Sequence, residues 1–214
     1  MSAKRLAFLM VFLSVLSFCS LAQDSRGFMK VNEVSVTVGR IFISTQTIQN
    51  STQPPPALHF GQEESLDFNY ARRFKDHGIF GFSAELPVSI SPRIDLATPS
   101  HGIPKDIGAL FITPSVRVNF FDGESLSPWV SIGGGYARFR QAPTLNFYGA
   151  NPGPRSTNTG AIQFGAGLDV WPWEHWGFRT EFRDFYSGVP DLNLKTGNSR
   201  QHNYYVGIGV IRRF

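Results

Sequence analysis

The side chains that could carry out chemistry in this 214-residue chain are few and widely spaced. Five histidines are present, and their spacing does not resemble a metal site: His59, His77, His101, His175 and His202. The triple glycine at 133–135 is not followed by the residues of a phosphate-binding loop. We therefore expect each histidine to lie in a loop or turn, and we expect no catalytic residue, no metal ion and no other cofactor.

Charged side chains offer a different kind of chemistry, because many recur at every second position among apolar residues. On this alternation four acids and five bases share one face: Asp67, Glu85, Asp169, Glu181, Arg73, Arg117, Arg179, Arg183 and Arg213. So close a balance favours ion pairing inside the molecule. The predicted ion-pair cluster consists of Glu85, Arg117, Glu181 and Arg183. It either fills the interior as a structural network or lines a polar path or a buried binding site.

The elements that position these charges are predicted strands, because the period of the pattern is two and no period of 3.6 follows residue 30. In 176–186, for example, Phe178 and Phe182 lie on one face and Arg179 and Glu181 on the other. Eight segments alternate in this way: 31–43, 64–74, 79–90, 107–120, 129–139, 161–170, 176–186 and 203–214.

Two of these segments have an uncertain pattern of inward and outward residues. In 31–43 a bulge near Gly39 and Arg40 could shift the alternation, and 129–139 is interrupted by its three glycines. Which residues of these two segments face inward is left open.

The connections between the segments alternate in length. Those at 44–63, 91–106, 140–160 and 187–202 are long, whereas those at 75–78, 121–128 and 171–175 are short. An up-and-down sheet places every second connection at the same end, so one end is tight and the other carries four extended loops. The chain is therefore predicted to be an all-β protein, an eight-stranded antiparallel up-and-down β-barrel.

The apolar face of such a barrel points inward in a soluble protein and outward in a membrane protein. Three features favour a transmembrane barrel. First, the polar face carries the small residues that a narrow lumen needs, namely Gly165, Gly167, Gly207 and Gly209. Second, the connections are long at one end of the barrel and short at the other. Third, aromatic residues collect near the strand ends, as in interfacial girdles: Phe120, Phe121, Trp171, Trp173, Trp176, Tyr186 and Phe214. The predicted lipid-facing residues include Phe68, Phe82, Val116, Phe164, Phe182 and Ile208.

The amino terminus is typical of a secretory signal peptide, with Lys4 and Arg5 before an apolar run and small residues at Ser20 and Ala22. We predict a signal peptide at 1–22 and a single barrel domain at 23–214. The only cysteine of the chain lies within the signal peptide. Cleavage leaves a net charge of about +2, and no basic patch indicates nucleic-acid binding.

With these features the chain resembles the small outer-membrane β-barrel family that includes the OmpA transmembrane domain and OmpX. The resemblance covers the whole mature chain. It implies a location in the outer membrane, with long loops extracellular and both termini periplasmic, and no periplasmic peptidoglycan-binding domain is expected after the last strand. It also implies that the barrel-assembly machinery reads an apolar alternation ending in an aromatic residue, carried here by Tyr204, Val206, Ile208, Val210 and Phe214. Arg212 departs from this pattern.

The partners implied are outer-membrane lipid, lipopolysaccharide and the assembly machinery, and a monomer is expected. The predicted function is adhesion, envelope scaffolding or ligand binding by the external loops, without an enzymatic reaction. A narrow passive channel and a lipid A-modifying barrel enzyme are the alternatives. The resemblance to a lipid A deacylase would require a histidine followed closely by Ser-Asn, whereas His202 is followed by Asn203 and Tyr204.

Overall fold

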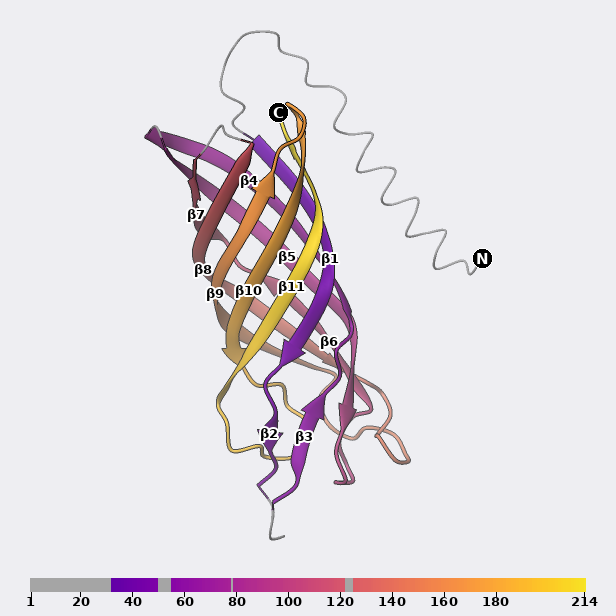
Figure 1. The fold of residues 1–214 in the computed structure, drawn as a ribbon. Helices are drawn as coiled ribbons and strands as arrows, with labels where there is room; N and C mark the ends of the chain where they lie inside the picture. The colour runs from indigo at the N-terminus through magenta and orange to yellow at the C-terminus, as the bar shows by residue number, and fades with distance from the viewer. Residues whose placement is uncertain (1–31, 50–54, 78, 122–124) are drawn as a thin grey trace, which may run out of the picture. The chain divides into compact units, whose positions relative to one another are not determined.

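The computed structural model describes residues 32–49, 55–77, 79–121 and 125–214. These residues form a closed antiparallel barrel (Figure 1). The predicted signal peptide at 1–22 and the predicted domain boundary after it lie outside the described residues. In the part of the chain that is described, no helix is long and apolar enough to cross a bilayer.

The barrel wall consists of eight strand positions, as the sequence predicts. Its strands are β1 (Asn32–Ile43), β4 (Glu64–His77), β5 (Phe80–Ala97), β6 (Asp106–Ile112) continued by β7 (Ser115–Phe120), β8 (Leu126–Gln141), β9 (Ser156–Val170), β10 (Trp176–Gly188) and β11 (Arg200–Arg213). Each pairs antiparallel with its sequence neighbour, and β1 pairs with β11 to close the barrel. Two short strands, β2 (Gln46–Thr47) and β3 (Ala57–Phe60), lie in the first long connection.

The break between β6 and β7 has a local cause in Pro114, which has no backbone N–H to donate to the sheet. The neighbouring strand β8 carries its glycines opposite this break. A Cβ atom at Gly135 would collide with the carbonyl oxygen of Ile112, and one at Gly133 would collide with that of Pro114. The triple glycine therefore lets β8 approach the interrupted strand closely.

The prediction of a possible bulge near Gly39 and Arg40 is wrong, because β1 is regular at both residues. The pairing of β1 with β11 and with β4 runs without a shift through both residues. Gly39 faces Gly207 across the β1–β11 pair, and a Cβ atom at Gly39 would overlap the carbonyl oxygen of Val206. The glycine permits a close backbone approach rather than a bulge. The register shifts lie instead between Arg73 and Lys75 and between Ser91 and Ile94.

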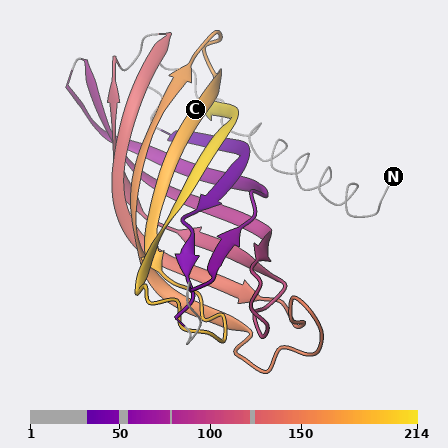
Figure 2. The same cartoon turned by 60° about the horizontal axis from the view of Figure 1, so that its bottom comes forward.

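The two ends of the barrel differ as the connection lengths predict. The short connections lie at one end, where the pairing of Glu33 with Arg213 also places the start of β1 and the end of β11. The long connections, with β2 and β3, gather at the other end (Figure 2). We call these the turn end and the loop end. β5 reaches Ala97 beyond the predicted segment 79–90, because the chain continues after its bulge and pairs with β3.

The two faces of the wall are also as predicted for a membrane barrel. Inward positions of the strands are buried and mostly polar, and outward positions are apolar and exposed, with Ile208 62% exposed. All six predicted lipid-facing residues point outward. Of the predicted aromatic girdle, Trp173 is exposed, but Trp171 is not. It is only 6% exposed, because its ring packs 4.3 Å beneath the guanidinium carbon of Arg213.

Candidate functional site: the filled lumen and the loop end

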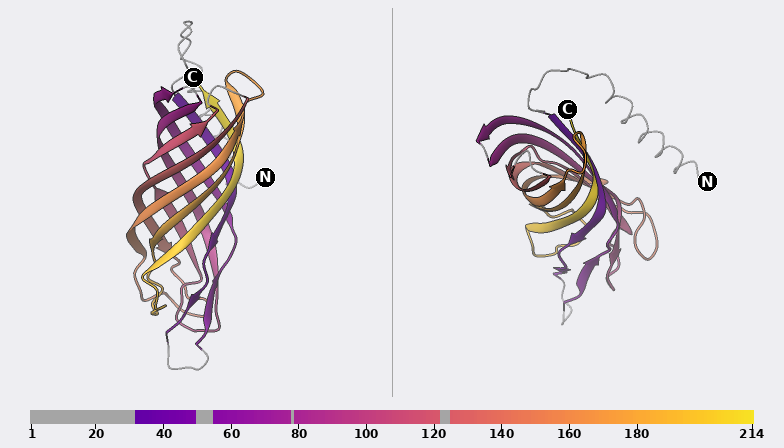
Figure 3. Two further views of the ribbon diagram at one scale, coloured as in Figure 1. Left: turned by 60° about the vertical axis from the view of Figure 1, so that its left-hand side comes forward. Right: turned by 45° about the horizontal axis from the view of Figure 1, so that its top comes forward.

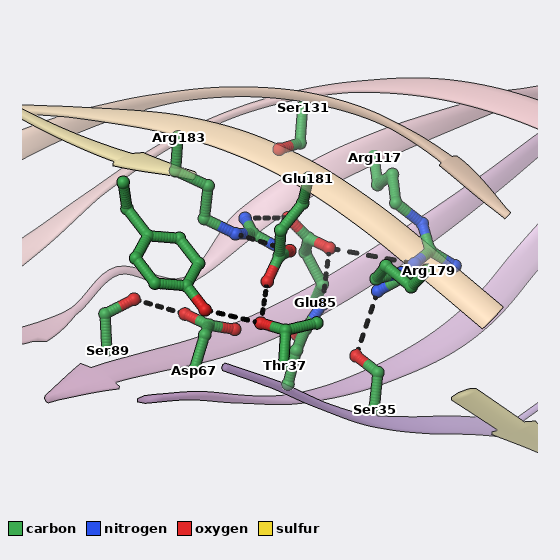
Figure 4. A network of polar contacts seen from close by, with 12 residues as sticks. Ser35, Thr37, Asp67, Glu85, Ser89, Arg117, Ser131, Arg179, Glu181 and Arg183 are labelled. Carbon is green, nitrogen blue, oxygen red and sulfur yellow. Dashed lines mark hydrogen bonds and ion pairs between the residues drawn. The ribbon is translucent and has the colours of Figure 1, made fainter. Parts of the chain in front are cut away.

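The structure places the four residues of the predicted ion-pair cluster together inside the barrel (Figure 4). Arg183 on β10 lies at the centre of the four. Its Nη1 donates to Glu85 Oε1 at 3.0 Å, and its Nε donates to Glu181 Oε2 at 3.1 Å. Arg117 on β7 is more weakly associated with the four, since its Nη1 lies 3.9 Å from Glu85 Oε2. All four side chains are buried.

The main partner of Arg117 is a residue that sequence reasoning missed. Arg117 donates to Glu33 on β1, which also lies 3.5 Å from Arg73 on β4. Glu33 was not counted among the interior acids because the alternation of 31–43 was left open. A signal existed, since Val34, Val36 and Val38 alternate with Glu33, Ser35 and Thr37. With Glu33 included, five acids face the five interior bases.

A second ion pair extends this network toward the turn end. Arg179 on β10 binds Asp169 on β9 through two hydrogen bonds, each 2.7 Å long. Trp129 on β8 donates from its indole N–H to the same carboxylate at 3.2 Å. The Trp129 ring also has three arginines around it, with guanidinium carbons 5.0 to 5.9 Å from the ring centroid. Each charge is therefore paired or placed against the π-system of the indole.

The inner-face glycines make room for this tryptophan. A Cβ atom at Gly165 or Gly167 would come into contact with the Trp129 ring. These glycines were predicted to line the lumen, but the large ring that requires them was not predicted. The signal was the shared alternation of Trp129, Ser131 and Gly133, hidden by the glycine interruption.

The loop side of this network is bounded by hydroxyl groups and by one further carboxyl group, that of Asp67. Thr37 on β1 donates to Glu181, and its Oγ1 lies 2.8 Å from the hydroxyl oxygen of Tyr205. Asp67 on β4 accepts from Ser89 on β5 (Figure 4). The buried polar network thus connects β1, β4, β5, β7, β8, β9, β10 and β11 across the lumen.

Toward the loop end the lumen contains an apolar core, with buried polar residues such as Gln201 and Asn203 on its β11 side. Phe111 stacks on Phe185 with ring centroids 4.4 Å apart and meets Phe139 edge-on at 5.8 Å. The long connections add further apolar side chains to this core: Ile48, Leu58, Ile103 and Leu192, all fully buried. We call this core the apolar plug. Side chains therefore fill the interior from the ion pairs to the loops.

Hydrogen bonds between different long connections join the loop end into one surface. The Gln49 N–H donates to the Lys195 carbonyl at 2.8 Å. The Asn193 side-chain amide donates to the Gly102 carbonyl at 2.9 Å and to Asn151 Oδ1 at 2.8 Å. These hydrogen bonds thus link all four long connections to one another.

Two features of this surface could receive a ligand. An exposed aromatic group lies on the third long connection, where Tyr148 is 92% exposed and the Phe147 ring lies 4.4 Å from that of His101. A hollow of about 420 Å³ lies between Gln49, Thr157 and residues 189–191 and 194–199. Neither was predicted from the sequence, because both depend on contacts between loops.

Two of the five histidines lie in connections, as predicted, and three lie in strands. His101 and His175 lie in connections, whereas His59, His77 and His202 lie in strands β3, β4 and β11. His202 Nδ1 lies 2.7 Å from Asp184 Oδ2 on the outer face. Among the described residues, no group of three or more His, Cys, Asp or Glu side chains could hold a metal ion.

The predicted assembly-signal residues follow the outer face of the last strand. Tyr204, Val206, Ile208 and Val210 occupy alternate outward positions of β11, and the strand ends at Arg213, one residue before Phe214. Arg212 also points outward, with its guanidinium carbon 5.2 Å from the centroid of the Trp176 ring. That contact lets the charge sit beside an aromatic residue at the turn end.

A closed eight-stranded antiparallel barrel with an apolar exterior and a charged, filled interior is a transmembrane β-barrel. No family model and no curated protein matches the sequence. Solved structures do match the fold. The Neisserial surface protein A structure has 13% identity over 86% of this chain and 97% of its own, with a TM-score of 0.53.

Two further matches are outer-membrane proteins. OprG from Pseudomonas aeruginosa has 12% identity over 86% of this chain and 97% of its own, with a TM-score of 0.51. AlkL, solved in DMPC bilayers, has 12% identity over 91% of this chain and 95% of its own, with a TM-score of 0.50. At these identities the likeness establishes the fold alone.

Proposed function

We propose that this chain is an integral outer-membrane protein whose loop end binds a partner outside the cell, while its lumen is closed. The observation that carries the proposal is the combination of a filled lumen with loops that are tied into one surface. We assign no reaction to it. In this role the protein acts as an adhesin or an envelope scaffold.

The filled lumen argues against the alternative of a passive channel. A permeating ion would have to pass the buried ion pairs around Arg183 and then the aromatic contacts of Phe111 and Phe185. An ion would lose its hydration at this level, where polar groups such as Asn203 are already hydrogen-bonded to the Phe185 carbonyl and to Ser187. The same packing gives the loops a rigid base, because four of their apolar side chains are anchored in the plug.

The loop surface has the composition of a binding site. Exposed aromatic rings such as Tyr148 offer large contact areas that lose little side-chain freedom on binding. The proposal further places the loop end outside the cell and the turn end in the periplasm, as in other barrels with short periplasmic turns. We further propose that the protein is a monomer surrounded by outer-membrane lipid and lipopolysaccharide. The assembly machinery inserts it through β11.

A pair of measurements tests this function. Purified barrel in detergent is applied to an array of surface glycans and matrix proteins. The variant Phe147→Ala/Tyr148→Ala is compared with Arg155→Ala, which changes another exposed residue of the same connection outside both candidate features. We expect the double variant to lose a binding signal that the control keeps. The same preparation should give no conductance steps in planar bilayers. Regular conductance steps, or equal binding by both variants, would contradict the proposal.

A further inference from the structure

The outer wall carries a hollow of about 730 Å³ across β1, β9, β10 and β11. These strands run side by side and steeply tilted through the wall (Figure 3). Apolar side chains line most of the hollow: Val38, Phe42, Leu168, Phe182, Val206 and Ile208. Small outward residues, Ala166 and Thr180, keep it open. A hollow of this kind on a lipid-facing wall fits a hydrocarbon chain.

Two charged residues are among the lining of this apolar hollow, and of these Glu181 points into the lumen and Arg40 points outward. Arg40 points outward from β1, is exposed, and lies three residues before the loop end of that strand at Ile43. Its cross-strand neighbour on β4 is Glu64, but the described residues form no ion pair with Arg40. A guanidinium near the loop end of the outer wall lies close to the membrane interface, where an anionic group of a lipid can pair with it. The charge complementary to this hollow is therefore negative, at its loop side.

Above the hollow, a continuous ladder of flat side chains climbs toward the loop end. Phe182 stacks on Tyr204 at 5.9 Å, Tyr204 on His202 at 5.5 Å, and His202 packs against Tyr186 at 4.8 Å, measured between ring centroids. The guanidinium carbon of Arg200 lies 5.5 Å from the centre of the Tyr186 ring. The ladder is contiguous with the hollow, because Phe182 belongs to both and Tyr204 pairs with Phe42.

The ladder combines flat faces with polar edges. Asp184 fixes the His202 ring through Nδ1 and leaves the other ring nitrogen for an external contact. Tyrosine rings and an imidazole present apolar faces to the C–H face of a sugar ring, and their hydroxyl and N–H groups bond to its hydroxyls. An apolar girdle alone needs neither the half-buried Asp184 nor the two cations Arg40 and Arg200.

We propose that this wall binds one molecule of an anionic glycolipid. An acyl chain lies in the hollow, a phosphate pairs with Arg40, and the saccharide rests on the ladder from Tyr204 to Tyr186. The inference rests on the proposed function in one respect, since an outer-leaflet glycolipid meets this site only if the loop end faces outward. The lipid with this chemistry is phosphorylated lipid A, rather than a glycerophospholipid without a sugar.

The test is native mass spectrometry of the refolded, detergent-solubilised barrel titrated with diphosphorylated lipid A, phosphatidylglycerol or phosphatidylcholine. The wild-type chain should retain one lipid A molecule, with phosphatidylglycerol weaker and phosphatidylcholine weaker still. Arg40→Gln should weaken lipid A retention about tenfold or more, because a charge-assisted hydrogen bond is lost. Arg138→Gln is its matched control, since Arg138 is also exposed, points outward and lies three residues before the end of its strand at Gln141.

A second pair of variants tests the acyl chain. Ala166→Phe fills the hollow and should abolish retention, whereas Ala84→Phe adds the same ring to the outer face of β5, away from the hollow, and should leave it unchanged. If Ala166→Phe does not refold, Thr180→Phe is used in its place, since it fills the hollow from β10. Folding of each variant is checked by the heat-dependent shift of the barrel on a gel.

The proposal is overturned if the paired variants behave alike, or if phosphatidylglycerol and lipid A are retained equally. These experiments are done in detergent and do not depend on orientation in the cell. Failure of glycolipid binding is therefore distinct from failure of the external-loop function, which the binding array and the conductance measurement test.

Discussion

Removal of Arg183 should be among the most damaging single changes to this barrel. The guanidinium lies 3.0 Å from Glu85 and 3.1 Å from Glu181, and all three side chains are buried. In Arg183→Met, Glu85 keeps only Arg117 at 3.9 Å, together with the neutral donors Asn69 and Ser115. Leaving a buried carboxylate without its partner costs about 3–5 kcal/mol of unfolding free energy.

A second substitution should recover part of this loss. In Arg183→Met/Glu85→Gln one of the two uncompensated charges is gone, so we expect a coupling energy of about 1–3 kcal/mol in the double-mutant cycle. The matched cycle with Arg117 and Glu85 should give a smaller coupling, because those atoms are 3.9 Å apart and the main partner of Arg117 is Glu33.

The assay is urea unfolding of barrel refolded into lipid vesicles, followed by gel mobility and tryptophan emission. Trp129 reports directly on the site, since its ring centroid is 5.2 Å from the Arg183 guanidinium carbon. Additive effects of Arg183→Met and Glu85→Gln would refute the reasoning, because they would mean that the two side chains do not interact.

Three further predictions concern topology, the lipid face and the close approach of two strands. A cysteine at Ser199 in the last long connection should label with a membrane-impermeant reagent on intact cells, and one at Ser125 in a short connection should not; the reverse pattern would contradict the proposed orientation. Phe164→Arg should cost about 2–4 kcal/mol in vesicles through its exposed position on the outer wall, and a negligible change in the urea midpoint would favour a soluble barrel. Gly135→Ala should lower the unfolding free energy of the barrel by about 1–3 kcal/mol, because the added Cβ atom would overlap a carbonyl oxygen of β6. The control Gly134→Ala should unfold like the wild type, because its Cβ atom would meet only the Ala161 carbonyl oxygen, at 3.5 Å.

Much of the wall could be predicted because alternation is a local property. In β10, the inward residues Arg179, Glu181 and Arg183 alternate with the outward residues Phe178, Thr180 and Phe182, and this alternation is enough to fix which residues face the lumen. The alternation of β1 is just as clear from Glu33 to Thr37, but Gly39 and the following Arg40 suggest a bulge, which leaves Glu33 out of the predicted interior. The backbone contact between Gly39 and Gly207 joins the two ends of the chain, and no local pattern contains it.

The features that depend on several segments could not be predicted. The position of Trp129 among three arginines requires the register of four strands. The apolar plug requires loop residues such as Ile48 and Leu192 to return to the lumen, although their segments carry no strand pattern. For the same reason the hollow beside Arg40 was not anticipated, since its lining comes from strands at both ends of the sequence.

The apolar plug also limits how these loops can diversify. Ile48, Leu58, Ile103 and Leu192 act as fixed anchor points within connections that otherwise face water. Sequence variation in these connections would then be confined to the spans between anchors, such as the tip around Tyr148. An engineer who wished to display a foreign peptide on this scaffold would insert it at such a tip and leave the anchors untouched, because an insertion there does not pull an apolar side chain out of the plug.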